Sequence, residues 1–165
     1  MKILFVCTGN TCRSYMAEKI FNYKIRTSFP DTDIRADSAG IYANHGESAS
    51  ENSVKVLKEK YGESVIDHSA KNINDELVKS ADLILTMTRN HKAILTSMFP
   101  EISSKVYTLI EYTMENTDQK CLERYDYRLD IPDPYGMPVD VYEKCAQSIE
   151  DAVDKLIERI KKNGI

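Results

Sequence analysis

Residues 3–14 read ILFVCTGNTCRS, and this stretch decides the fold. Its first four residues are all apolar, which is typical of a short strand buried in a parallel sheet. A helical pattern follows, and we expect a helix over residues 14–27. Residues 7–14 therefore connect the carboxyl end of a strand to the N-terminus of a helix. Backbone N–H groups are unpaired at a helix N-terminus, and they favour an anion.

This connecting loop has the composition of a phosphate site. Gly9 allows a positive φ and Asn10 tolerates one, so consecutive N–H groups can turn inward as a nest for an anion. The planar fork of Arg13 can hold two phosphate oxygens, which a lysine cannot do. We therefore predict a phosphate-binding loop, and its residues are Thr8, Gly9, Asn10, Thr11, Cys12, Arg13 and Ser14.

Cys7 is the candidate nucleophile, because the thiolate of cysteine attacks strongly. A free thiol has a pKa of about 8.5, and a helix N-terminus with a nearby cation lowers the pKa to roughly 3.5–7.5. The inward N–H groups, Arg13 and the Ser14 hydroxyl can all stabilise negative charge on sulfur. The plainer alternative is a buried structural cysteine beside a surface arginine. The strand–loop–helix setting favours the phosphate site over this alternative.

Strand-like and helical segments alternate along the rest of the chain. We expect strands over residues 2–6, 33–37, 83–87 and 105–108. We expect helices over residues 14–27, 50–61, 75–80, 89–98 and 139–162, and a long polar segment before the last one. This order predicts an α/β fold with helices on both faces of a parallel sheet, in one domain over residues 1–165. Ligands of such sheets bind beyond the carboxyl ends of the strands.

Composition narrows the partners. Charged residues make up 29% of the 165 residues and the net charge is −4, which argues against a nucleic-acid partner. No apolar run approaches the ~20 residues that span a bilayer, and the first residues do not read as a signal peptide. We expect a cytoplasmic monomer that binds no membrane. The four cysteines have no Cys-x-x-Cys spacing, so we expect no metal or other cofactor.

A cysteine that displaces phosphate from a poor leaving group needs a proton donor, which typically contributes 10²–10⁴-fold. Asp133 is the best candidate, because it lies in the sequence PDPYG, where the neighbouring prolines stiffen the chain. Tyr135 can form an aromatic wall for the substrate, and Tyr42 and Thr11 are expected beside it. The alternative is an ordinary surface turn. Asp126 and Asp130 are weaker candidates for the acid.

Two further features concern the loop itself. A loop that turns its amides inward needs outside hydrogen bonds, and we predict that Asn10, Ser38 and His68 supply them together with Ser14. Cys12 lies in the same short loop as Cys7, and the two can pair transiently under oxidation and protect the nucleophile. The alternative is that Cys12 is only a small packed side chain.

These motifs resemble those of the low-molecular-weight protein tyrosine phosphatase family along the whole chain. The resemblance implies a four-stranded parallel sheet in the order 2-1-3-4. It implies that Cys7 is the nucleophile, Arg13 the phosphate clamp and Asp133 first an acid and then a base. It also implies that Ser14 stabilises the thiolate and that Asn10, Ser38 and His68 brace the loop. The expected activity is hydrolysis of phosphorylated proteins through a phosphocysteine, with inorganic phosphate as a product.

Thr11 bears on the substrate within this family. Tyrosine-specific members usually carry a β-branched aliphatic residue at this position, whereas threonine resembles the bacterial protein-arginine phosphatases. His91-Lys92 is similar to the same branch, and the acid loop has one aromatic residue where tyrosine-specific members often have two. Tyr15 departs from the branch, which commonly has proline there, and we expect it to change the pocket rim. We therefore favour phosphoarginine over phosphotyrosine.

Two other functions remain as alternatives. Thiol-dependent arsenate reduction uses a related loop, but it needs two further cysteines near the middle of the chain, and residues 60–110 contain none. A non-catalytic phosphate-binding module would be free to lose Cys7 and Asp133, and both are present.

Overall fold

A computed structural model describes residues 1–114 and 127–162. Its four strands form a single parallel sheet in the order β2-β1-β3-β4, which is the expected order. The strands are β1 (Lys2–Cys7), β2 (Arg35–Gly40), β3 (Leu83–Thr86) and β4 (Val106–Thr108). The α-helices are α1 (Arg13–Ser28), α2 (Glu51–Tyr61), α3 (Asp75–Ser80), α4 (Arg89–Met98), α5 (Leu109–Thr113) and α7 (Val139–Lys162). Short 3₁₀ turns cover Glu63–Val65, Pro100–Lys105 and Tyr127–Leu129.

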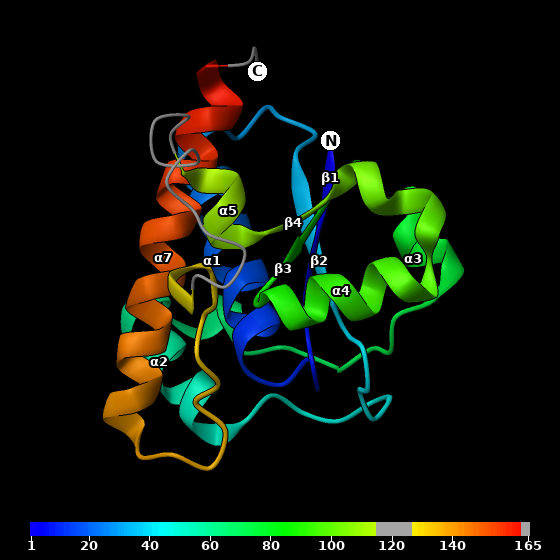
Figure 1. Cartoon of the computed structure of the whole chain (residues 1–165). Helices are drawn as coiled ribbons and strands as arrows, with labels where there is room; N and C mark the ends of the chain where they lie inside the picture. The colour runs from blue at the N-terminus through cyan, green and yellow to red at the C-terminus, as the bar shows by residue number, and fades with distance from the viewer. Residues whose placement is uncertain (115–126, 163–165) are drawn as a thin grey trace.

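The sheet lies between two layers of helices, as expected (Figure 1). Helices α1, α2, α5 and α7 cover one face, and α3 and α4 cover the other. Successive side chains of a strand point to opposite faces. Ile3 and Phe5 of β1 accordingly pack in the core beneath α1 and α7, whereas Leu4 and Val6 pack in the core beneath α3 and α4. This two-sided burial explains why β1 is a continuous apolar run.

Side-chain caps fix the start of four helices. Ser50, Asn74, Thr88 and Thr108 each accept a hydrogen bond from the backbone N–H three residues later. Such a cap satisfies one of the N–H groups that the first turn of a helix leaves unpaired. The cap at Thr108 begins helix α5, which lies in a region that we expected to be polar and without a helix; that part of the prediction was wrong.

The predicted second strand was also misplaced. We expected it over residues 33–37, but β2 runs from Arg35 to Gly40, and its last residue pairs with Cys7 at the end of β1. Asp37 and Ser38 are poor strand formers, so the local signal ended too early. Pairing with β1 overrides that preference. The extension brings Ser38 and Gly40 beside the loop that follows β1.

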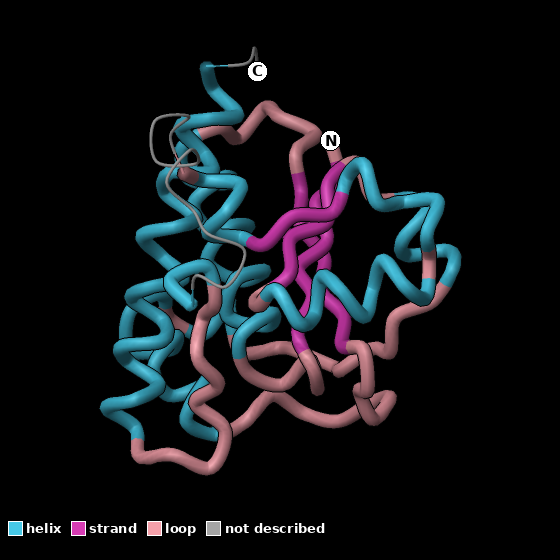
Figure 2. Tube along the Cα trace, viewed as in Figure 1, coloured by secondary structure: helices cyan, strands magenta, loops and turns pink. Residues whose placement is uncertain are grey.

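Loops gather at the carboxyl end of the sheet (Figure 2). The order β2-β1-β3 means that the chain leaves β1 toward one side and later returns to the other, which is the point where such sheets bind ligands. The loop after β2 is tied to the loop after β1, because Tyr42 N–H donates to the Thr8 carbonyl at 3.0 Å. None of the helices in the described ranges is long and apolar enough to cross a membrane.

Candidate active site at the end of the central strand

Cys7 is the last residue of β1, and its sulfur lies beneath the first turn of α1. The Asn10 N–H donates to Cys7 Sγ at 3.3 Å, and the Ser14 hydroxyl lies 3.0 Å from the same sulfur. The residue is only 2% exposed. A helix N-terminus, an N–H bond to sulfur and a nearby hydroxyl are surroundings that suit a nucleophilic cysteine.

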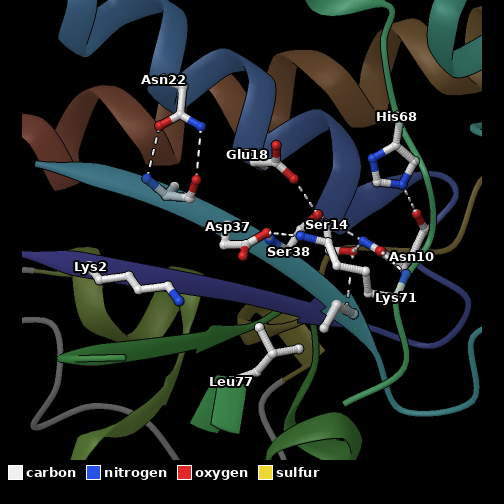
Figure 3. A network of polar contacts seen from close by, with 12 residues as sticks. Lys2, Asn10, Ser14, Glu18, Asn22, Asp37, Ser38, His68, Lys71 and Leu77 are labelled. Atoms are coloured by element: carbon white, nitrogen blue, oxygen red, sulfur yellow. Dashed lines mark hydrogen bonds and ion pairs between the residues drawn. The ribbon is translucent and has the colours of Figure 1, made fainter. Parts of the chain in front are cut away.

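Asn10 holds the loop in shape (Figure 3). Its side-chain amide donates to Ser14 Oγ at 2.9 Å and to Ser38 Oγ at 2.8 Å, and its side-chain oxygen accepts from the Lys71 N–H at 2.9 Å. Asn10 has a φ of 58° and is the one non-glycine residue with positive φ in the described part of the chain. We expected Gly9 to provide this conformation as well, but its φ is not positive. Asparagine suffices because it tolerates this region.

A second set of contacts supports Asn10 from outside the loop. His68 Nε2 donates to the Asn10 carbonyl at 2.6 Å, and its ring packs on Tyr15 with centroids 4.7 Å apart. Burial lowers the pKa of His68, although its bond to the Asn10 carbonyl opposes this effect. The Ser38 hydroxyl donates to Glu18 of α1 at 2.5 Å. The structure thus brings Asn10, Ser14, Ser38 and His68 together, as we expected from the sequence.

Arg13 and Asp133 meet on the open side of the loop. Arg13 Nη2 lies 2.5 Å from Asp133 Oδ2, and Nη1 donates to the Ile131 carbonyl at 3.2 Å. The Arg13 side chain is 5% exposed, whereas the Asp133 side chain is 48% exposed. Arg13 Nε is buried without a partner among the described residues. The Arg13 side chain is therefore fixed inside the protein, while the Asp133 carboxyl remains accessible to solvent.

Asp130, one of the two weaker candidates for the acid, pairs with a different arginine. The Asp130 carboxylate accepts hydrogen bonds from the Arg89 side chain at 3.0 Å and from the Arg89 backbone N–H at 2.8 Å. Burial raises the pKa of Asp130, but the hydrogen bonds and charge of Arg89 outweigh burial, so the pKa is lowered overall. Asp130 thus anchors the segment before Asp133 to the start of α4. Asp126, like Cys121, lies outside the described residues.

A cavity of about 250 Å³ opens above the loop. It is lined by Cys7, Thr8, Gly9, Thr11, Cys12, Arg13, Tyr42, Asn44, Glu47, Asp133 and Tyr135. The predicted wall residues Thr11, Tyr42 and Tyr135 all line it. The two tyrosines are 68% and 70% exposed, so they form the rim, whereas Thr11 is buried. The cavity is thus polar and charged at its floor and aromatic at its opening, which suits a phosphorylated side chain.

Tyr15 occupies a different place from the one that the sequence suggested. Tyr15 is fully buried beneath the loop, and its hydroxyl donates to the Val65 carbonyl at 2.8 Å. Our expectation that it changes the pocket rim was therefore wrong; a helical residue one position after Ser14 points into the core. Cys12 is a free thiol whose sulfur contacts the Ser50 hydroxyl at 3.2 Å. Cys7 is also free.

Several residues of the site were not predicted from the sequence, Asn44 among them. His91 is buried, with Nε2 2.9 Å from the Thr8 hydroxyl and Nδ1 2.9 Å from the Thr88 hydroxyl. Gly40 lies so close to the loop that an added Cβ would stand 2.4 Å from the Thr8 carbonyl oxygen. Glu47 lines the cavity. The sequence pair His91-Lys92 pointed to His91, but nothing in the local sequence distinguished Gly40 or Glu47.

Comparisons with known proteins show the family of this chain. The family model for low molecular weight phosphotyrosine protein phosphatase matches residues 2–164, and the chain belongs to that family. A protein-arginine-phosphatase of Bacillus subtilis (strain 168) is 35% identical over 163 residues, with 99% of each chain covered.

Solved structures of the same kind are similar along the whole chain. A low molecular weight protein tyrosine phosphatase from T. tengcongensis has a TM-score of 0.83 at 45% identity, covering 96% of this chain and 99% of that one. A C7S mutant of YwlE arginine phosphatase with a phosphorylated active site serine has a TM-score of 0.86 at 34% identity, covering 99% and 98%.

Proposed function

We propose that this chain is a protein phosphatase that transfers the phosphoryl group to Cys7 and then to water. The Cys7 sulfur attacks phosphorus as the bond to the leaving group breaks, and Asp133 gives that group its proton. Arg13 and the loop N–H groups stabilise the equatorial oxygens, where negative charge spreads in the transition state. The single observation that carries this proposal is the convergence of Cys7, Arg13 and Asp133 on one cavity.

The second step regenerates the enzyme. The Asp133 carboxylate takes a proton from water, the water oxygen bonds to phosphorus, and the bond between sulfur and phosphorus breaks. Inorganic phosphate leaves, and Cys7 returns to its starting state. The ion pair between Arg13 and Asp133 holds the carboxyl at the opening, and phosphoryl oxygens compete for the same guanidinium when substrate binds. The similar YwlE mutant carries phosphate on its active site serine, which supports transfer to the matching side chain here.

For the substrate, we propose phosphoarginine on proteins, with phosphotyrosine as the second candidate. Thr11 lines the cavity, where threonine adds a hydroxyl and leaves more room than isoleucine for a branched planar group. The similarity to a protein-arginine-phosphatase favours the first substrate. The similarity to tyrosine phosphatases, and the aromatic rim of Tyr42 and Tyr135, keep the second one open.

The test compares kcat/KM on two peptides that differ only in carrying phosphoarginine or phosphotyrosine. We expect the wild type to prefer phosphoarginine. Thr11→Ile narrows the cavity by about one methylene, a difference typically worth 10–200-fold. We expect it to lower kcat/KM for phosphoarginine and to spare phosphotyrosine. A wild type that prefers phosphotyrosine would overturn the substrate assignment, and an unchanged ratio in Thr11→Ile would remove Thr11 from it.

We also propose that residues 1–165 act as one domain and as a monomer in the cytoplasm. The cores on the two faces share one sheet, and the family model extends over residues 2–164, which supports a single folding unit. Light scattering on the purified chain tests the monomer, since a mass twice that of the chain would contradict it.

A further inference from the structure

Glu47 is an acidic residue in a cavity built for an anion. It lies in the loop between β2 and α2, and the backbone holds it in place, because its N–H donates to the Asn44 carbonyl at 3.1 Å and its carbonyl accepts from the Ala70 N–H at 2.8 Å. Asn44 Nδ2 also donates to Glu47 Oε2 at 3.2 Å. The carboxylate is exposed to solvent at the cavity wall.

The charges along the cavity explain what this carboxylate can do. Among the residues that line it, three are charged: Arg13, Asp133 and Glu47. Arg13 and Asp133 pair with each other. Glu47 hydrogen-bonds an amide, so its charge stays uncompensated by any lining cation. A negative charge here repels a phosphate group, so this position favours a substrate that carries a positive charge beyond its phosphate.

Phosphoarginine carries such a charge and phosphotyrosine does not. The guanidinium of an N-phosphorylated arginine stays cationic and keeps N–H donors in one plane, a geometry that a carboxylate accepts well. The phenyl ring of phosphotyrosine is neutral and has no donor. With phosphorus held at Cys7 and Arg13, the rest of the phosphorylated side chain has to pass through the cavity that Thr11 and Glu47 both line.

Building on the proposed function, we propose that Glu47 is a specificity-determining residue that accepts hydrogen bonds from the guanidinium of phosphoarginine. Its charge then has opposite effects on the two substrates. It attracts the cationic guanidinium of phosphoarginine and repels the phosphate of phosphotyrosine. A purely structural function of Glu47 would affect both substrates in the same direction.

The experiment measures kcat/KM for Glu47→Gln on the same pair of peptides, with no lysine or arginine beside the phosphorylated residue. We expect kcat/KM for phosphoarginine to fall roughly 10-fold, the usual size for loss of a charged hydrogen-bond partner. We expect kcat/KM for phosphotyrosine, and inhibition by inorganic phosphate, to stay the same or improve. Glu158→Gln makes the same charge change on the exposed side of α7, and we expect it to change neither substrate.

The outcomes separate the two proposals. A wild type that hydrolyses no phosphoarginine overturns the proposed substrate class. A wild type that hydrolyses it, with a Glu47→Gln variant that loses the same factor on both peptides or on neither, overturns only the inference about Glu47. A fall confined to phosphoarginine, with Glu158→Gln unchanged, supports both.

Discussion

Asn10 shows how one residue can shape the candidate active site through both its backbone and its side chain. Its backbone N–H is directed at Cys7, its carbonyl accepts from His68, and its side chain ties together Ser14 and Ser38. Asn10 makes these hydrogen bonds from a backbone conformation with positive φ. Because the Asn10 N–H reaches Cys7 from this conformation, the position constrains both the side chain and the backbone.

Two substitutions separate these constraints. Asn10→Gly removes the side-chain bonds and makes positive φ readily accessible. Asn10→Ala removes the same bonds but retains a Cβ at positive φ, which costs about 1–2 kcal/mol relative to glycine. We expect both to lower the free energy of unfolding by about 2–4 kcal/mol, with Asn10→Ala the less stable. Urea denaturation measures this difference. An Asn10→Ala variant as stable as Asn10→Gly, or more so, would mean that the backbone conformation matters little.

The sequence identified the residues whose chemistry is rare. It did not identify residues whose importance depends on their position in the folded chain. Cys7, Arg13 and Asp133 belong to motifs with few alternative explanations. Glu47 and Gly40 are ordinary residues of a polar loop and a strand end, and only the pairing of β2 with β1 brings Gly40 against Thr8. No property of a single sequence window encodes that approach.

Helix α4 is the element that links the loop to the rest of the molecule on its far side. Thr88 caps the helix and also bonds His91, whose other ring nitrogen reaches Thr8. Arg89, the first residue of the helix, binds Asp130 and so fixes the segment before Asp133. One helix N-terminus thus positions both the phosphate loop and the acid loop.

The pH dependence of stability tests the contribution of His91. Burial, together with the charge of Arg13, lowers its pKa to about 4, while Asp133 and Asp130 oppose the shift. An unfolded histidine has a pKa of about 6.5, so between about pH 6.5 and pH 4 the unfolded chain binds a proton that the folded chain does not. The stability that neutral His91 contributes is therefore complete above about pH 6.5 and decreases toward pH 4.

His91→Gln removes this dependence. At pH 7.5 we expect the variant to be less stable by about 1–2 kcal/mol, because two buried hydrogen bonds are disturbed. At pH 5 the difference from wild type should shrink. Thermal unfolding at the two pH values measures it, with His45→Gln as a control at an exposed position. A difference that stays constant or grows on acidification would contradict a buried neutral His91.

At the level of elements, the long periodic segments were the most predictable. Helix α7 was predicted at residues 139–162, where the structure has it, because it presents a regular apolar stripe. The end of β2 was not predicted, because pairing with β1 decides it. The short helix α5 was not predicted either, because it depends on a capping box at Thr108. These are contacts between distant or flanking residues, which local propensity does not contain.

The fold of the whole molecule places Cys7, the proposed nucleophile, where the sheet exposes its strand ends. The order β2-β1-β3-β4 puts β1 in the interior of the sheet, and Cys7 at its end pairs with Gly40 of β2. The alternation of strands and helices predicted the layers, and the resemblance to the phosphatase family supplied the strand order. Only the folded chain shows that loops after β1 and β2 and before α7 share one cavity.

The central claim is that phosphate passes through the Cys7 sulfur. The direct measurement mixes enzyme with an aryl phosphate that has a good leaving group, quenches within one turnover and maps the phosphoryl group by mass spectrometry. We predict phosphate on Cys7 in the wild type, and more of it in Asp133→Asn, where water lacks its base. Steady turnover with phosphate on another residue, or with no phosphorylated enzyme in either protein, would contradict the account.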